Sequence, residues 1–230
     1  THTMFPGFIS RDLSDQLLPI ARHWKSQNVT LDAICTGYLA SPLQTEEVCR
    51  FFDLLAGPDT LLFVDPAMAD GFGPDFPGYM RRVVARAHVA VPNVTEACLL
   101  TGTPYRETED LSWWRDLLRR VADLGPRYPV LTGVPFGPDR LGVLALDPDT
   151  GGFFDYHTPR VHDHFHGTGD IFSAACAGAM VRGKSLPEAL RLAADFTLAC
   201  IQVTCRDPNA PWYGVEFEKA LHLLPGLLEG

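Results

Sequence analysis

The sequence lacks several features that would each assign it to a class of protein. No apolar run approaches the roughly 18 residues that a membrane-spanning helix needs, and no basic segment followed by an apolar one stands where a secretory leader would. The 230 residues also contain no internal repeat and no low-complexity linker. We therefore expect a cytoplasmic globular protein that does not bind membranes.

Positive charge is scarce as well. The 19 lysines and arginines are outnumbered by 28 aspartates and glutamates, which gives a formal net charge of −9 at pH 7. A surface of this sign repels nucleic acid and anionic lipid, so neither is expected as a partner. Any phosphate-binding site must therefore be a local feature.

Short paired cysteine spacings are absent too. Spacings of that kind are typical of zinc and redox sites, whereas the six cysteines of this chain are scattered, at Cys35, Cys49, Cys98, Cys176, Cys200 and Cys205. Cys35 and Cys176 flank motifs discussed below, but a small core residue is the simpler interpretation of each. The pattern favours reduced, buried thiols in a cytoplasmic protein.

The chain does contain enough apolar residues for a large core. At 46% hydrophobic residues, it suits one large α/β domain, although two small domains would also fit the length. Hydrophobic periodicity predicts helices and strands in alternation. The expected helices cover 12–27, 45–55, 76–87, 93–100, 110–124 and most of the chain from 167 onward; the expected strands cover 31–35, 61–64, 88–91, a segment ending at 130–131, and an antiparallel pair at 141–147 and 152–157.

This alternation predicts a mostly parallel sheet covered by helices on both faces, with an antiparallel edge. In such sheets ligands bind beyond the carboxyl ends of the strands. Chemically informative residues follow the ends of four predicted strands, at Gly37-Tyr38, Asp65, Asn93 and Thr132-Gly133. We expect them to line one edge of the sheet.

Residues 166–180 form a glycine-bracketed turn that runs into an apolar helix. A helix start exposes unpaired N–H groups at the positive end of its dipole, and Gly167 and Gly169 would let that backbone approach a phosphate closely. Asp170 would stand beside the anion, where a carboxylate can accept the proton of an attacking hydroxyl. The segment indicates phosphoryl transfer to an alcohol; the alternative is an ordinary helix start capped by Thr168 or Asp170.

Five short segments occur in a characteristic order: His2-Thr3, Thr36-Gly37-Tyr38-Leu39, Asp65-Pro66-Ala67-Met68-Ala69-Asp70-Gly71, Pro92-Asn93-Val94-Thr95-Glu96-Ala97 and the Gly167-Thr168-Gly169-Asp170 turn. Together with the tail at 213–218, this series resembles the pyridoxal kinase branch of the ribokinase superfamily. The resemblance covers nearly the whole chain.

The resemblance implies a ribokinase-like three-layer α/β fold, with 1–230 as one kinase domain. It also implies ATP-dependent phosphorylation of the 5′-hydroxymethyl group of a vitamin B6 vitamer (pyridoxal, pyridoxine or pyridoxamine), in salvage of pyridoxal 5′-phosphate, and a homodimer. Asp170 would be the catalytic base, and the anion hole would be formed by Gly167, Thr168 and Gly169.

Three carboxylates match the family's metal region, namely Asp65, Asp70 and Glu96. Hard oxygen ligands suit Mg²⁺ that is shared with waters and nucleotide phosphates. Each residue also has a local interpretation: a strand-end turn for Asp65, a turn former for Asp70 and a first-turn helix carboxylate for Glu96. Because the three carboxylates occur in the same order as in the family, the resemblance implies Mg²⁺ as cofactor and ATP as co-substrate.

Three further positions match the nucleotide side of the family. Asn93 is expected to cap the following helix, to contact the phosphate-and-metal region, or both. Thr132 matches a position that faces ATP phosphates, and Phe165 matches an apolar position near the adenine; a strand-end hydroxyl and a core aromatic are the local alternatives.

On the acceptor side, the resemblance places His2, Thr3 and Tyr38 around the pyridine ring of the vitamer. A flat heteroaromatic substrate needs an aromatic wall and a few polar groups, and Tyr38 would supply such a wall. The alternative interpretation of Tyr38 is a half-buried residue at a strand end that does not contact substrate. The alternating histidines at 162, 164 and 166 are read as one face of a strand and not as metal ligands.

The sequence departs from the family pattern at three places. It begins at Thr1, within the His-Thr segment, so we expect the family's opening strand and helix to be absent from this sequence. Ala67 and Ala69 replace the usual Val and Gly of the metal loop, and 160–164 has no lid signature.

Two alternative functions remain open. One is hydroxymethylpyrimidine (phosphate) kinase activity in thiamine synthesis, although those relatives often carry Cys at the position of Asp170. The other is a catalytically silent B6-binding homologue, which the altered metal loop favours and Asp170 disfavours.

Overall fold

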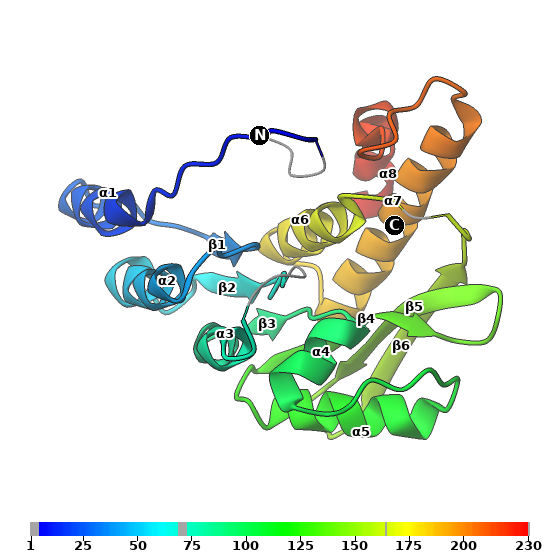
Figure 1. Cartoon of the computed structure of the whole chain (residues 1–230), viewed down its shortest axis with the longest axis horizontal. Coiled ribbons are helices and arrows are strands. Elements are labelled where there is room, and N and C mark those ends of the chain that lie inside the picture. Colours follow the sequence, from blue (N-terminus) through cyan, green and yellow to red (C-terminus); the bar gives the residue numbers. More distant parts are fainter. Residues whose placement is uncertain (1–4, 69–72, 164, 230) are drawn as a thin grey trace.

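The computed structural model describes residues 5–68, 73–163 and 165–229. Within these residues, helices and strands alternate up to residue 101, and after that point one helix, three strands and four helices follow one another (Figure 1). The helices are α1 (Ser14–Ser26), α2 (Pro42–Leu55), α3 (Phe76–Val84), α4 (Val94–Thr101), α5 (Leu111–Ala122), α6 (Thr168–Val181), α7 (Leu186–Arg206), the 3-10 helix η1 (Phe217–Leu223) and α8 (Leu224–Glu229). The strands are β1 (Ala33–Thr36), β2 (Leu61–Val64), β3 (Val89–Ala90), β4 (Tyr128–Pro135), β5 (Arg140–Leu146) and β6 (Phe153–Pro159).

The strands form one mixed six-stranded sheet in the order β1-β2-β3-β4-β5-β6. β1 to β4 pair in parallel, and β5 and β6 add an antiparallel edge. The carboxyl ends of β1 to β4, the start of β5 and the end of β6 therefore share one edge of the sheet. The expected mostly parallel sheet with an antiparallel edge is confirmed.

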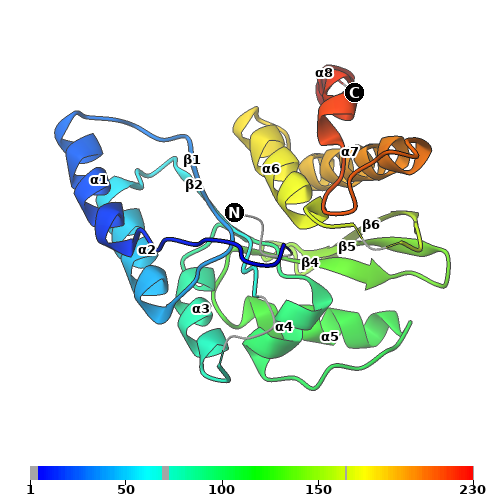
Figure 2. The same ribbon diagram turned by 45° about the horizontal axis from the view of Figure 1, so that its top comes forward.

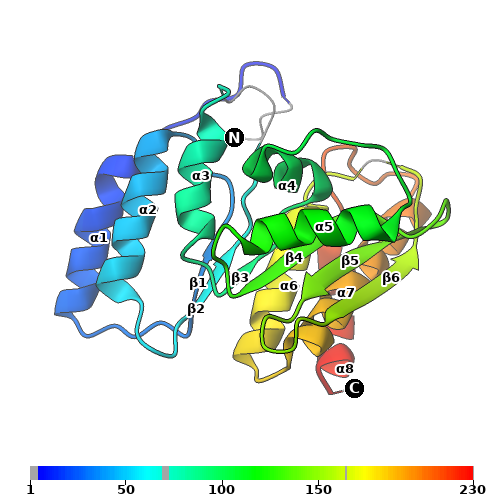
Figure 3. The same ribbon diagram turned by 90° about the horizontal axis from the view of Figure 1, so that it is seen from below.

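Side chains of the strands alternate between the two faces of the sheet, because successive residues of a strand point in opposite directions. Phe63 and Val130 pack with α6 and α7 on one face. Their neighbours Val64 and Leu131 pack against helices of the α1-to-α5 side on the other face. Figure 2 shows α6, α7 and α8 above the sheet and α4 and α5 below it, and Figure 3 shows α1, α2 and α3 side by side. The expected three-layer fold is confirmed, and no helix in the described residues is long and apolar enough to cross a bilayer.

Most element boundaries differ from the sequence prediction by a few residues, and two of these differences have a clear structural reason. The helix expected at 45–55 begins at Pro42, because the Ser41 hydroxyl caps it by accepting from the Gln44 N–H at 3.2 Å. The strand expected to end at 130–131, just before Thr132-Gly133, instead runs on to Pro135. Its ladder with β5 continues through a bulge between Thr132 and Val134, where Gly133 takes the left-handed conformation at φ 71°.

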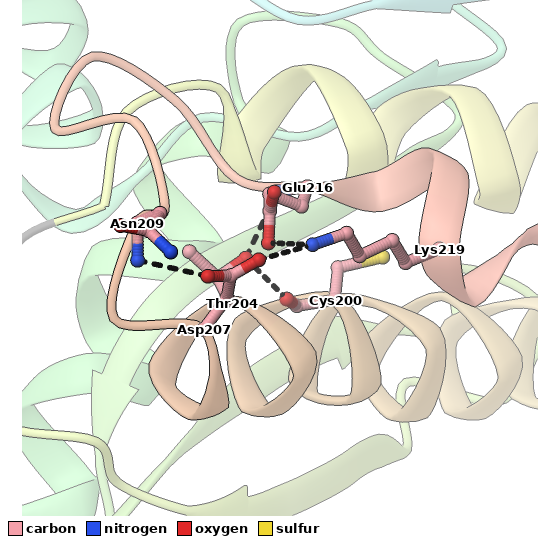
Figure 4. A network of polar contacts seen from close by, with 6 residues as sticks. All are labelled: Cys200, Thr204, Asp207, Asn209, Glu216 and Lys219. Atoms are coloured by element: carbon pink, nitrogen blue, oxygen red, sulfur yellow. Dashed lines mark hydrogen bonds and ion pairs between the residues drawn. The ribbon is translucent and has the colours of Figure 1, made fainter.

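The segment 207–216 interrupts the helix that the sequence predicts over the last part of the chain. It folds back onto the end of α7 through the polar network of Figure 4. The Thr204 hydroxyl donates to the Cys200 carbonyl at 2.7 Å and accepts from the Glu216 N–H at 2.9 Å. Lys219 bridges Asp207 and Glu216 at 2.5 and 2.8 Å. These contacts fix the tail against α7, one of the helices that line the site described next.

Replacing Thr204 by valine is expected to lower the free energy of unfolding by about 1–3 kcal/mol, because the Glu216 N–H loses its acceptor beside a buried side chain. Urea unfolding followed by circular dichroism measures the change. The control is Thr197→Val. Among the described contacts, the Thr197 hydroxyl makes one hydrogen bond, which it donates to the Ala193 carbonyl at 2.7 Å. Equal losses in both variants would contradict this role of Thr204.

Candidate functional site

A cavity of about 500 Å³ lies at the edge of the sheet where the strand ends gather. The segments after β2, β3 and within β4 contribute Asp65, Asn93 and Thr132, and the first turn of α6 contributes 167–170. α7 closes another side with mostly apolar side chains, and the β5–β6 hairpin supplies Leu141, Gly142 and Thr158. Residues from well-separated parts of the sequence thus line one space, as the strand-end rule predicts.

The start of α6 is shaped to receive an anion. Gly167 stands at the N-cap with φ 82°, a left-handed conformation that favours glycine, and no described side chain caps this end. The Thr168 hydroxyl donates backward to the Phe165 carbonyl at 3.4 Å. The alternative in which Thr168 or Asp170 caps the helix is therefore wrong, and among the described contacts no side chain occupies the first N–H groups of α6, where an anion can bind.

Asp65 lies directly after β2 and faces the start of α6. Its backbone N–H donates to the Thr36 carbonyl at 3.0 Å, and its carboxylate accepts from the Ser173 hydroxyl at 2.7 Å. Burial raises the pKa of Asp65 to about 6, the bond from Ser173 opposes this rise, and the nearby charge of Asp170 adds to it. Asp170 itself is exposed and lines the same cavity.

Asn93 and Glu96 form a reciprocal capping box at the start of α4. The Asn93 side chain accepts from the Glu96 N–H at 2.9 Å, and the Glu96 carboxylate accepts from the Asn93 N–H at 2.8 Å. The other Glu96 oxygen accepts from the Met68 N–H at 3.4 Å. Asn93 therefore caps the helix and lines the cavity at once, so the two interpretations of this residue are compatible.

Glu96 is a buried carboxylate of the cavity, and the half-buried Asp65 is near it. Burial raises its pKa to about 7, hydrogen bonding from Asn93 opposes the rise, and the charge of Asp65 adds to it. Two neighbouring carboxylates that repel one another, one buried and one half-buried, favour a cation between or beside them. Glu96 is 7% exposed.

The donor set fits Mg²⁺. The described residues contain no group of three or more histidine, cysteine, aspartate or glutamate side chains placed to hold a metal. Mg²⁺ suits this arrangement, because it keeps several waters and is held through one or two carboxylates together with substrate phosphates. Asp65 and Glu96 would supply those carboxylates; Asp70, the third predicted ligand, lies outside the described residues.

Of the three residues predicted for the acceptor side, the structure describes only Tyr38. His2 and Thr3 lie outside the described residues. Tyr38 is 59% exposed and is not among the described residues that line the cavity. Phe165 and Thr132, predicted for the nucleotide side, do line it. Of the histidine trio, His162 is exposed and lies 3.8 Å from Asp139, and His164 is outside the description.

Sequence reasoning missed several lining residues. Ser173 follows Asp170 by three positions and so shares its helix face, a spacing that would have identified it. The lining residues of α7 carry no such local signal, because only tertiary packing brings them to the site; they are Ala194, Thr197, Leu198 and Ile201.

Glu96→Gln is expected to change the free energy of unfolding in a pH-dependent way. The folded protein keeps a proton on Glu96 up to about pH 7, whereas the unfolded chain loses it near the ordinary value of 4.5, so this group lowers stability as the pH rises through that window. Gln resembles the protonated form, so the variant should gain about 1–3 kcal/mol relative to wild type between about pH 5 and about pH 8. Urea unfolding without Mg²⁺ measures it. A pH-independent difference in the free energy of unfolding between the two proteins would refute the raised pKa of Glu96. The control variant is Asp116→Asn, which changes an exposed carboxylate.

Comparison with known proteins places this site in context. A family model described as phosphomethylpyrimidine kinase matches residues 20–210. A hydroxymethylpyrimidine/phosphomethylpyrimidine kinase from Streptomyces coelicolor is 30% identical over 183 residues, which are 76% of this chain and 64% of that protein. The chain thus spans less than two thirds of the length of that relative.

Two solved structures are also similar. A protein from Bacteroides thetaiotaomicron, assigned as a phosphomethylpyrimidine kinase and crystallised with pyridoxal, is 34% identical with a TM-score of 0.90, covering 97% of this chain and 81% of its own. Pyridoxal kinase from Lactobacillus plantarum is 29% identical with a TM-score of 0.84, covering 99% and 82%. Relatives named for both substrates therefore share this fold.

Proposed function

The chain belongs to the phosphomethylpyrimidine kinase family, and we propose that it transfers the γ-phosphoryl group of ATP to the 5′-hydroxymethyl group of a vitamin B6 vitamer. The observation that carries this proposal is the start of α6, which no described side chain caps, which shares one cavity with the carboxylates of Asp65 and Glu96, and which carries Asp170 in its first turn. We assign this activity to the whole chain, 1–230, as one kinase domain.

In this mechanism the vitamer's alcohol attacks the γ-phosphorus in line, and the bond from that phosphorus to the bridging oxygen of ADP breaks. Asp170 accepts the proton that the hydroxyl loses. The N–H groups of Gly167, Thr168 and Gly169 donate to the oxygens of the transferring group, and the helix dipole stabilises their negative charge. The products are the 5′-phosphate and ADP.

The remaining predicted residues hold the two substrates. Mg²⁺, bound through Asp65, Asp70 and Glu96, would neutralise phosphate charge during transfer. Asn93 and Thr132 would contact the phosphates and Phe165 the adenine. His2, Thr3 and Tyr38 would surround the pyridine ring. We also propose a homodimer in the cytoplasm.

Two observations support the B6 substrate. The carboxylate Asp170 stands where hydroxymethylpyrimidine kinases often carry Cys. The similar Bacteroides thetaiotaomicron protein was crystallised with pyridoxal although it is assigned as a phosphomethylpyrimidine kinase.

A second candidate function is phosphorylation of hydroxymethylpyrimidine or its phosphate, favoured by the family model and by the relative from Streptomyces coelicolor. A third is a silent B6-binding homologue, favoured by Ala67 at the edge of the cavity.

ADP formation measured with pyridoxal, pyridoxine, pyridoxamine and hydroxymethylpyrimidine separates these functions. We expect kcat/KM to be highest for one of the pyridine vitamers. A higher value for hydroxymethylpyrimidine would move the assignment to the thiamine branch, and no turnover with any acceptor would favour the silent homologue.

A further inference from the structure

Ser173 makes a contact to which the mechanism above assigns no role. It lies on α6 one turn beyond Asp170, and its hydroxyl donates to Asp65 Oδ2 at 2.7 Å. The two residues are 108 positions apart in the sequence, so the bond joins the helix that starts at the anion site to the end of strand β2.

This bond restricts the carboxylate of Asp65. The backbone of Asp65 is already held by the bond from its N–H to the Thr36 carbonyl. The remaining freedom lies in the two side-chain torsions, and the outer one, which rotates the carboxylate, is a broad torsion that packing alone defines poorly. Ser173 restrains that torsion by donating to Oδ2, whereas Oδ1 accepts no hydrogen bond among the described contacts of this cavity-lining residue.

The surroundings of Oδ2 give the bond a second consequence. A Cβ built on Gly169 would lie 3.9 Å from Asp65 Oδ2, so this oxygen is adjacent to the anion-binding turn itself. If Ser173 did not hold it, a carboxylate this close to the turn would be free to accept from the N–H groups that are to receive the phosphate. A carboxylate there would compete with a phosphate for the same donors.

We propose that Ser173 is a positioning residue that orients the Asp65 carboxylate, so that one oxygen serves the divalent cation and neither occupies the phosphate position at the start of α6. This inference rests on the proposed function and deepens it. Hydrogen-bond partners that orient a metal ligand typically change metal affinity by about 10–100-fold when they are removed.

The test measures metal binding directly, without turnover. Mn²⁺ replaces Mg²⁺, and its binding in the presence of a non-hydrolysable ATP analogue is followed by electron paramagnetic resonance in the full chain. Ser173→Ala should weaken Mn²⁺ binding by about tenfold or more, while Ser173→Thr, which keeps a hydroxyl, should stay within a few-fold of wild type. Alanine favours helices, so folding of the alanine variant is expected and is checked by circular dichroism.

A matched control removes the same kind of contact elsewhere. Ser14 on α1 also donates its hydroxyl to an aspartate, Asp12, and is buried. Ser14→Ala should leave Mn²⁺ binding unchanged.

A double-mutant cycle with Asp65→Asn tests whether Ser173 acts through Asp65. In the Asp65→Asn background the Ser173→Ala change should add little, because the carboxylate that it orients is gone. An equal further loss in that background would overturn the proposal, as would wild-type Mn²⁺ binding in Ser173→Ala or equal weakening in the Ala and Thr variants. If the wild-type chain binds neither Mn²⁺ nor the analogue, the proposed function fails first and the inference falls with it.

Discussion

Asp170→Asn is expected to lower kcat by about 10²-fold or more while leaving affinity for nucleotide within a few-fold of wild type. Asparagine keeps the shape of the side chain but cannot take the proton from the attacking hydroxyl. The N–H groups of 167–169 that would hold the phosphate are unchanged, because they belong to the backbone of the turn and helix start. Steady-state ADP release and calorimetric binding of an ATP analogue measure the two quantities.

The control for this prediction is Asp116→Asn on α5, whose carboxylate pairs with Arg119 at 2.7 Å on the exposed helix surface. It should retain wild-type kcat. Turnover in Asp170→Asn that is comparable with this control would show that Asp170 is not the base. A loss of nucleotide affinity equal to the loss of kcat would point instead to a role in binding.

Gly142→Ala is expected to lower the free energy of unfolding by about 3 kcal/mol or more. Gly142 lies in β5 between β4 and β6, opposite Val134 and His157. A Cβ added there would come within 2.1 Å of the Tyr156 carbonyl oxygen and 2.7 Å of His157 Cα, both backbone atoms. The β5–β6 pairing would have to open, and because Gly142 also lines the cavity, nucleotide binding should fall as well. Urea unfolding and calorimetry measure these effects.

Gly178→Ala provides the matched control. Gly178 is exposed within α6, and nothing lies within 4 Å of a Cβ built on it. Alanine there should stabilise the protein by about 0.5–1 kcal/mol through the better helix propensity. If Gly142→Ala were as stable as wild type, the tight β5–β6 packing described here would be wrong.

Local signals predicted much of the fold. The apolar run at 61–64, followed by Asp65-Pro66, gave the bounds of β2, and the prediction that Asn93 caps the start of α4 is confirmed. These features depend on neighbours in sequence, so they can be read without the tertiary structure.

The features that sequence did not reveal depend on tertiary contacts. β4 runs through Thr132-Gly133 because β5 continues to pair with it past the bulge, and that pairing is set by a partner strand. The α7 wall of the cavity lies far along the chain from the motifs. Conversely, Tyr38 follows β1 as predicted but is exposed and outside the cavity lining, so its role on the acceptor side stays a prediction.

The most direct test of phosphoryl transfer at the start of α6 follows the phosphate itself. The chain is incubated with ATP labelled at the γ-phosphate, Mg²⁺ and a slight excess of pyridoxal, and the labelled products are separated. The account predicts that the label appears in pyridoxal 5′-phosphate and that this transfer collapses in Asp170→Asn. Label released only as inorganic phosphate, or transferred equally well by Asp170→Asn, would contradict it.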